Sequence, residues 1–250
     1  MAVNGHHYGA KIVIASPSAT YHTYTTWGLT LTNGDPIGAP AQETNYINIP
    51  GRSNLLDYSD ALTGYPVFKG RTITMNMAMS GEPDAWVSKV SKIRNAIEGK
   101  QVKVYFDDDP SHYWLGRINI KDSTRTRKLG QFTMLMYADA YKYDKYSSQE
   151  RIRWDDINFE TDCFRYLGAV QITDSGTITV PKGSMEVVPT IRVTNKTSEN
   201  FVMTVNNTTY TLANNTTYKY PEIKVCGASD KVFTFTGTAK VTITYRGGSL

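Results

Sequence analysis

The chain has 250 residues, of which 40% are apolar and 20% charged, a composition that excludes a disordered tail and a coiled coil. Its net charge of +4 is spread evenly, since residues 1–150 contain 16 Lys and Arg against 14 Asp and Glu, and residues 151–250 contain 11 against 9. Nucleic-acid binding proteins usually concentrate their basic residues, so sequence-specific nucleic-acid recognition is not expected. No run approaches the ~20 apolar residues of a membrane span and no secretory pattern is found. We therefore expect a soluble protein that folds in the cytosol and does not insert into membranes.

Residue patterns typical of β-strands dominate the first half of the chain. Residues 72–77 alternate Thr or Asn with Ile or Met, which is typical of a strand with one wet and one buried face. Turn residues recur at short intervals, at Asn33-Gly34-Asp35-Pro36, Pro50-Gly51 and Asp109-Pro110. This spacing favours hairpins and sandwich-like packing.

Residues 83–98 break this pattern and predict a helix. Four apolar residues fall on one stripe at helical spacing, namely Trp86, Val90, Ile93 and Ile97. Pro83 suits the first turn, Asp84 suits the positive end of the helix dipole, and Gly99 suits a left-handed stop. We expect this helix to cover one face of the N-terminal sheet.

A hairpin is predicted next, from residues 101–106 through an acidic turn to residues 113–120, followed by a strand at 131–138. Gly116 would let two backbones approach closely, and Arg117 could donate to carboxylates. Because unpaired strand edges invite association, residues 103–120 and the surrounding sheet are expected to form a contact surface between copies of the chain.

A polar, aperiodic stretch at residues 145–153 marks the predicted boundary between a domain at 1–150 and a domain at 151–250. Beyond it, about seven short Thr-rich strands and the turn candidates Asn206-Asn207 and Asn214-Asn215 predict an antiparallel sandwich.

The residue types that carry chemistry do not form a recognisable catalytic pattern. Asp107-Asp108-Asp109 lacks the alternating ligands, the Gly and the distal Glu of a calcium loop, so a solvated hairpin turn is favoured. No GxSxG, P-loop or GxGxxG pattern is present, and His112 is interpreted as a turn residue. We expect no enzyme activity, no metal and no cofactor.

Two further residue groups leave alternatives open. Cys163 and Cys226 lack CxxC spacing and are interpreted as reduced, partly buried residues, with a disulfide as the alternative. Tyr210, Tyr218 and Tyr220 could stack on sugar rings, although cross-strand packing is favoured. A carbohydrate-binding adhesion module that recognises host cell-surface glycans is therefore the alternative function.

Several stretches, read in order, resemble the siphophage distal tail (Dit) family. They include Thr26-Trp27-Gly28-Leu29, an extended segment ending in Pro50-Gly51-Arg52, the helix with the glycine after it, Asp108-Asp109-Pro110, Gly116-Arg117, and Tyr141-Lys142-Tyr143. Where the family pattern usually continues with glycines after Pro-Gly-Arg, this chain has Ser53-Asn54-Leu55. The residues that carry the resemblance are Trp27, Gly28, Pro50, Gly51, Arg52, Trp86, Gly99, Asp109, Pro110, Gly116, Arg117 and Tyr141.

The resemblance implies a mainly β protein: an N-terminal belt domain, which is a β-sandwich with one α-helix and a long β-hairpin, and a C-terminal galectin-like β-sandwich. It further implies a homohexameric ring in the baseplate that joins the tail tube to the tip or adhesion complex and allows DNA passage. The implied partners are the tail tube protein, a tail-associated hub or lysin protein, and receptor-binding proteins. The implied location is the virion, at the phage tail tip, after assembly in the host bacterial cytoplasm.

Overall fold

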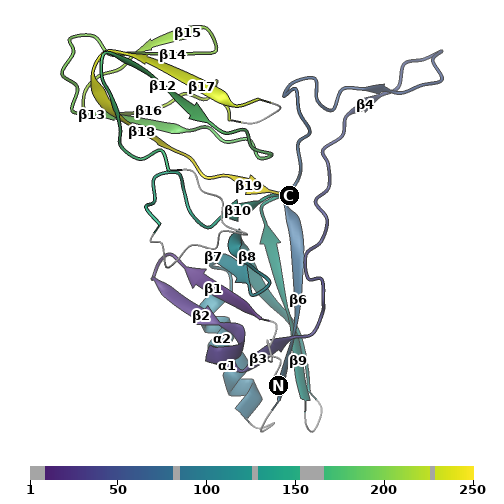
Figure 1. Cartoon of the computed structure of the whole chain (residues 1–250). Coiled ribbons are helices and arrows are strands. Elements are labelled where there is room, and N and C mark those ends of the chain that lie inside the picture. The colour runs from purple at the N-terminus through teal and green to yellow at the C-terminus, as the bar shows by residue number, and fades with distance from the viewer. Residues whose placement is uncertain (1–8, 81–84, 126–128, 153–165, 226–228) are drawn as a thin grey trace, which may run out of the picture. The chain divides into compact units, whose positions relative to one another are not determined.

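The computed structural model describes residues 9–80, 85–125, 129–152, 166–225 and 229–250 (Figure 1). Pro83, Asp84, His6, His7, Cys163 and Cys226 lie outside these residues. The chain divides into two compact units, Met1–Lys142 and Tyr143–Leu250. Antiparallel strands predominate in both units, which confirms the predicted fold class. None of the helices in the described part is long and apolar enough to span a membrane.

One antiparallel sheet organises the N-terminal unit, with the strand order β2-β1-β7-β8-β9-β6-β3 (Figure 1). Its strands are β1 (Ala10–Ile14), β2 (Ala19–His22), β3 (Leu29–Leu31), β6 (Arg71–Ser80), β7 (Gln101–Phe106), β8 (Asp109–Arg125) and β9 (Leu129–Ala138). Strict alternation of buried and less buried residues along β9 shows why these sequences form strands, since every second side chain enters the core. The strands predicted at 72–77, 101–106, 113–120 and 131–138 are confirmed.

Methionine is unusually frequent in the core of this unit. Met75, Met77 and Met79 on β6, and Met134 and Met136 on β9, are each at most 2% exposed. Met75 lies directly opposite Met134 in the β6–β9 ladder. Unbranched thioether side chains fill irregular gaps, so the core face of these two neighbouring strands is adaptable.

The predicted helix is present as α2 (Trp86–Ile97) and contacts β8. Trp86, Ile93 and Ile97 are buried and Val90 is partly buried against the same core, so the predicted apolar stripe is confirmed. Gly99 has a φ of +70° and donates its N–H to the carbonyl of Ile118 at 2.9 Å. The left-handed stop predicted at this glycine is therefore also present.

A second, shorter helix, α1 (Thr23–Trp27), was not predicted. His22 caps its N-terminus, because its Nδ1 accepts hydrogen bonds from the N–H groups of Tyr24 at 3.2 Å and Thr25 at 3.3 Å. Gly28, with a φ of +60°, ends the helix and donates to the carbonyl of Tyr24 at 2.6 Å. Both ends are thus satisfied by specific residues.

Between β3 and β6 the chain forms a two-stranded ribbon, which we call the arm and define as residues 41–69. Its short strands β4 (Tyr46–Ile47) and β5 (Leu56–Asp57) pair antiparallel. At the base, Glu43 donates its N–H to the carbonyl of Val67, and Lys69 donates to that of Ala41, each at 2.8 Å. The arm therefore leaves and re-enters the N-terminal unit at neighbouring points.

The C-terminal unit contains two four-stranded antiparallel sheets, ordered β11-β18-β13-β16 and β12-β17-β14-β15 (Figure 1). The strands are β11 (Val170–Ile172), β12 (Ser175–Val180), β13 (Thr190–Thr194), β14 (Val202–Val205), β15 (Thr208–Thr211), β16 (Thr216–Lys219), β17 (Lys231–Thr236) and β18 (Ala239–Thr244), accompanied by the short strands β10 (Lys142–Asp144) and β19 (Gly248–Ser249). Apolar residues of both sheets form one buried cluster, as in a sandwich. Asn206 and Asn207 both have positive φ and make the two-residue turn between β14 and β15.

Candidate functional site

The arm is the most exposed part of the described chain that has regular strand pairing. None of its residues, from 41 to 69, is buried. Pro50, Gly51 and Arg52 lie in its outer turn, where Arg52 donates its N–H to the carbonyl of Ile49 at 3.1 Å. Gly51 has a φ of +82°, a conformation that a side chain disfavours. An isolated two-stranded ribbon is marginally stable in water at best, so the arm is built to contact something else.

Apolar side chains of the arm face solvent. The exposed fractions are 54% for Tyr46, 61% for Leu55, 45% for Tyr58 and 100% for Leu62. Single exposed apolar residues are ordinary, but their gathering on one short ribbon is characteristic of an interaction surface.

A second candidate surface is a groove beside α2, which we call the α2 groove. It has a volume of about 260 Å³ and is lined mainly by Met79, Trp86, Val87, Val90, Phe132 and Arg94. Gly130 forms part of its floor, and a Cβ added there would fall 1.3 Å from a ring carbon of Trp86. The absence of a side chain at Gly130 therefore allows the Trp86 ring to approach β9 closely and shape the groove.

The hairpin expected at residues 103–120 does not offer the free edge on which that expectation was based. β7 pairs with β1 on one side and β8 on the other, and β8 pairs with β7 and β9. Its backbone donors and acceptors are thus used inside the sheet, so the edge argument for this hairpin is wrong. Along the strand path of the N-terminal sheet, the outermost strands are β2 and β3.

Close backbone approach at Gly116 is present as predicted. A Cβ added to Gly116 would lie 2.1 Å from the carbonyl oxygen of Tyr137 on the adjacent strand. The next residue, Arg117, donates from Nη1 to the backbone carbonyl of Gly99 at 2.6 Å. The acceptor found for Arg117 is therefore a helix-end carbonyl rather than a carboxylate, and the pair ties the end of α2 to β8.

Aromatic residues of the predicted motif set pack within the N-terminal unit. Trp27 stacks on Tyr21 with a centroid distance of 5.0 Å. Tyr141 meets Phe68, at the base of the arm, edge to face at 6.1 Å. These contacts give both motif residues a structural role.

The acidic turn forms a small ionic cluster at the start of β8, where Pro110 follows Asp109. The Asp109 carboxylate is 2.7 Å from Nδ1 of His112 and 2.7 Å from Nζ of Lys142. Burial alone would raise the pKa of Asp109, but the hydrogen bonds and positive charges of these two partners lower it from 3.8 to about 2. Asp107 instead contacts Nε2 of His22 at 3.0 Å.

This pairing gives the acidic turn a structural explanation. In the described part of the chain, no three His, Cys, Asp or Glu side chains are grouped so that they could hold a metal ion. The cluster ties β8 to the end of the N-terminal unit through Lys142 and orients His112 through its 2.7 Å contact with Asp109.

The three tyrosines proposed as glycan contacts do come together. Tyr210 and Tyr220 have ring centroids 4.3 Å apart, and Tyr218 stacks on Tyr220 at 5.7 Å with an interplanar angle of 5°. The hydroxyl of Tyr210 donates to Glu222 at 3.1 Å, and that of Tyr218 accepts the N–H of Ala213 at 2.7 Å. Tyr220 contacts both other rings, stacked on Tyr218 and tilted by 43° to Tyr210, so mutual packing accounts for the position of the three side chains.

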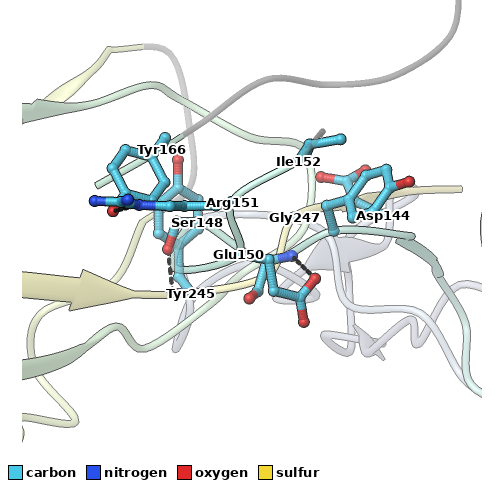
Figure 2. A pocket seen from close by; sticks show the side chains of 10 residues that line it. Asp144, Ser148, Glu150, Arg151, Ile152, Tyr166, Tyr245 and Gly247 are labelled. Atoms are coloured by element: carbon cyan, nitrogen blue, oxygen red, sulfur yellow. Dashed lines mark hydrogen bonds between the residues drawn. The ribbon is translucent and has the colours of Figure 1, made fainter. Parts of the chain in front are cut away.

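A cleft of about 290 Å³ in the C-terminal unit was not predicted (Figure 2). Ser148, which is 2% exposed, lies on its wall and accepts the N–H of Tyr245 at 2.8 Å while donating to the carbonyl of Ile243 at 2.8 Å. Arg151 donates to the hydroxyl of Tyr166 at 3.0 Å. The two bonds of Ser148 hold the segment before β11 against the end of β18, and no nucleophile–base pair is formed by these contacts.

Comparisons with known proteins bear on the fold. No protein-family profile matches the chain, and no curated protein matches it by sequence. The crystal structure of the Dit (gp 19.1) protein of phage SPP1 superimposes with a TM-score of 0.62, covering 95% of this chain and 98% of that chain at 12% identity. The chain has the Dit fold.

Coverage of nearly the whole length of both chains means that the Dit likeness includes the N-terminal unit and the C-terminal unit together. The resemblance inferred from the motif residues is thereby confirmed for the fold. The SPP1 protein is described as "a Paradigm of Hub Adsorption Apparatus in Gram-positive Infecting Phages".

Proposed function

We propose that this chain is a structural subunit of a phage tail tip, a Dit-type hub rather than an enzyme. The observation that carries this proposal is the end-to-end fold match to SPP1 Dit. In this role the chain assembles with copies of itself into a hexameric ring in the baseplate. The ring joins the tail tube protein to the tail-associated hub protein and leaves a passage for DNA, with receptor-binding proteins at its rim.

The exposed arm supports assembly on physical grounds. A ring needs two different complementary surfaces on each subunit, because head-to-tail contacts close only when one patch of a copy meets another patch of the next. Residues 41–69 provide exposed apolar side chains, and none of these residues is fully buried in the single chain. Ordering such a ribbon costs conformational entropy, which burial against a neighbour offsets.

Mass and shape of the purified full-length chain test the proposal. Light scattering over a concentration series is expected to show a species of six subunits, and negative-stain images are expected to show rings with a central hole. A chain that stays monomeric at the highest attainable concentration, with no ring in the images, would contradict the proposal.

A variant in which residues 46–65 are replaced by a short Gly-Ser linker gives the matched comparison. Because no arm residue is buried, its thermal unfolding is expected to stay close to that of the unmodified chain while the rings are lost. Rings of unchanged stability in this variant would show that the arm has no part in assembly.

A further inference from the structure

The imidazole of His22 is hydrogen-bonded through both of its nitrogens. Its Nδ1 accepts the N–H groups of Tyr24 at 3.2 Å and Thr25 at 3.3 Å, which caps helix α1. Its Nε2 lies 3.0 Å from a carboxylate oxygen of Asp107. A carboxylate only accepts hydrogen bonds at neutral pH, so Nε2 carries the proton and Nδ1 carries none. The ring is therefore neutral and is held in one tautomer.

Protonation of this ring is incompatible with the cap. A second proton, on Nδ1, would point at two N–H donors, and an imidazolium offers no acceptor. The two N–H groups of α1 would then lose their partner, whereas the contact between Nε2 and Asp107 persists and becomes charge-assisted. Histidine is suited to this exchange, because an imidazole changes its charge between about pH 5 and 8.

The charged neighbours of His22 act in opposite directions. Asp107, directly after β7, favours the protonated ring, whereas Lys11, which faces His22 in the β1–β2 ladder, disfavours it. Helix α1 and strand β3 contain no acidic or basic residue. Lys89 of α2 lies near Gly28, at the opposite end of α1. The effect of a proton on α1 therefore follows from the capping geometry.

Helix α1 depends on this cap more than a long helix would. It has five residues, and their helix propensity is low. Tyr24, Thr25 and Thr26 are exposed, and Thr23 alone among the five is buried. The helix joins β2 to β3, the outermost strands along the path of the N-terminal sheet. A change in the order of α1 therefore reaches both edges of this sheet, where another chain can pair.

We propose that His22 is a pH-sensitive switch for helix α1. With a neutral imidazole the helix is capped and the link between β2 and β3 is ordered. When His22 takes up a proton, the cap is lost and the exposed residues of α1 fray. Thr23 stays in place, because its hydroxyl accepts the N–H of Ala10 at 3.0 Å. The switch belongs to the single folded chain and does not depend on ring assembly.

Hydrogen–deuterium exchange of the full-length chain tests the switch. Exchange in the peptide that spans α1 is followed by mass spectrometry at about pH 7.5 and about pH 5, with the labelling time scaled to the intrinsic exchange rate at each pH. Protection is expected to fall about fivefold at the lower pH, since loss of a side-chain cap shifts a local equilibrium by about that factor. In the His22→Asn variant, protection is expected to be equal at both pH values, because asparagine caps a helix without titrating.

Two controls separate the switch from other effects of acid. Peptides from β8 and β9 report global unfolding and are expected to show the same protection in every chain. His6 and His7 lie outside the described residues, and a chain with both replaced by asparagine is expected to respond to pH like the unmodified chain. A response that disappears in this chain would assign the titration to His6 or His7 and overturn the proposal.

Two further results would contradict the switch. The first is unchanged protection of α1 in the unmodified chain at the lower pH. The second is a His22→Asn variant that loses protection as the unmodified chain does. If His22→Asn does not fold, His22→Ser replaces it, because serine is also a strong cap that does not titrate.

Discussion

Replacement of Gly116 by alanine is the sharpest test of how the N-terminal sheet is built. Gly116 lies in the middle of the sheet, opposite Val102 on β7 and Ala138 on β9. The new Cβ would lie 2.1 Å from the carbonyl oxygen of Tyr137, 2.8 Å from its carbon and 2.9 Å from Cα of Ala138. All three atoms belong to backbone, so no side-chain rotation relieves the contact.

The strands β8 and β9 must therefore separate by roughly 1 Å at this point, given that carbon contacts lie at about 3.5 Å and strain is shared over several bonds. Overpacking of this kind costs about 1–3 kcal/mol. Weakening of one or two ladder hydrogen bonds adds about 1 kcal/mol. We expect the free energy of unfolding of the N-terminal unit to fall by about 3 kcal/mol, a sum of these two contributions.

Urea unfolding followed by tryptophan fluorescence measures this change, because three of the four tryptophans of the chain, Trp27, Trp86 and Trp114, belong to the N-terminal unit. Gly34→Ala is the matched control, since a Cβ at Gly34 meets nothing within 4 Å and no positive φ is needed there. The control is expected to change stability by less than about 0.5 kcal/mol. Equal midpoints for the two variants would refute the inferred clash.

Three further substitutions test the ionic cluster, the buried cation and the C-terminal core. Asp109→Asn is expected to lower the free energy of unfolding by about 1–2 kcal/mol at neutral pH, allowing for a side chain about one-third exposed. Because the pKa of Asp109 in the folded chain is lowered to about 2, the difference in stability from the unmodified chain should vanish in thermal melts as the pH falls from about 4 to 2. Arg71→Met is expected to leave the melting temperature nearly unchanged, because Nε and Nη2 of Arg71 are buried with no hydrogen-bond partner among the described residues and burial lowers the pKa of this side chain. The contact of the guanidinium with the Trp114 ring at 4.6 Å is only a modest gain. A fall in the free energy of unfolding of more than about 2 kcal/mol would reveal a partner for the guanidinium. Phe235→Ala removes a fully buried ring stacked on Phe201 at 5.7 Å and should cost about 3–5 kcal/mol, seen by calorimetry in the transition of the C-terminal unit; an unchanged transition would contradict the assigned core.

Long periodic elements were predictable from sequence because their side chains repeat the geometry of the element. The alternation in β6 and β9 and the stripe on α2 express burial on one face, which the core confirms. Turn positions such as Gly99 and Asn206-Asn207 were predictable for a local reason, because few residues accept positive φ.

Local sequence did not reveal the elements that depend on distant partners. The five-residue helix α1 has the sequence Thr-Tyr-Thr-Thr-Trp, which has low helix propensity, and it forms because His22 and Gly28 satisfy its ends. His22 is itself oriented by Asp107, 85 residues away.

The position of a strand within its sheet also could not be predicted from the local sequence. The hairpin made by β7 and β8 has the alternation of any half-buried pair, and only the topology shows that β1 and β9 cover both its edges. The arm has little periodicity, since nothing in it is buried, so its extended segment was identified only through the Dit resemblance and its strand pairing was not predicted. The ring-forming and galectin-like roles assigned to the two halves stay predictions.

The methionines on the core face of β6 and β9 have a mechanical consequence. Branched aliphatic side chains interlock, so a small shift of the sheet against the residues that pack on its core face opens voids or forces poor rotamers. Thioether chains absorb such a shift by rotating about several bonds. A sheet that is bound at both edges thus changes its curvature slightly while its core stays packed. Exchanging Met75 or Met134 for leucine would stiffen the sheet while changing the free energy of unfolding by less than about 1.5 kcal/mol.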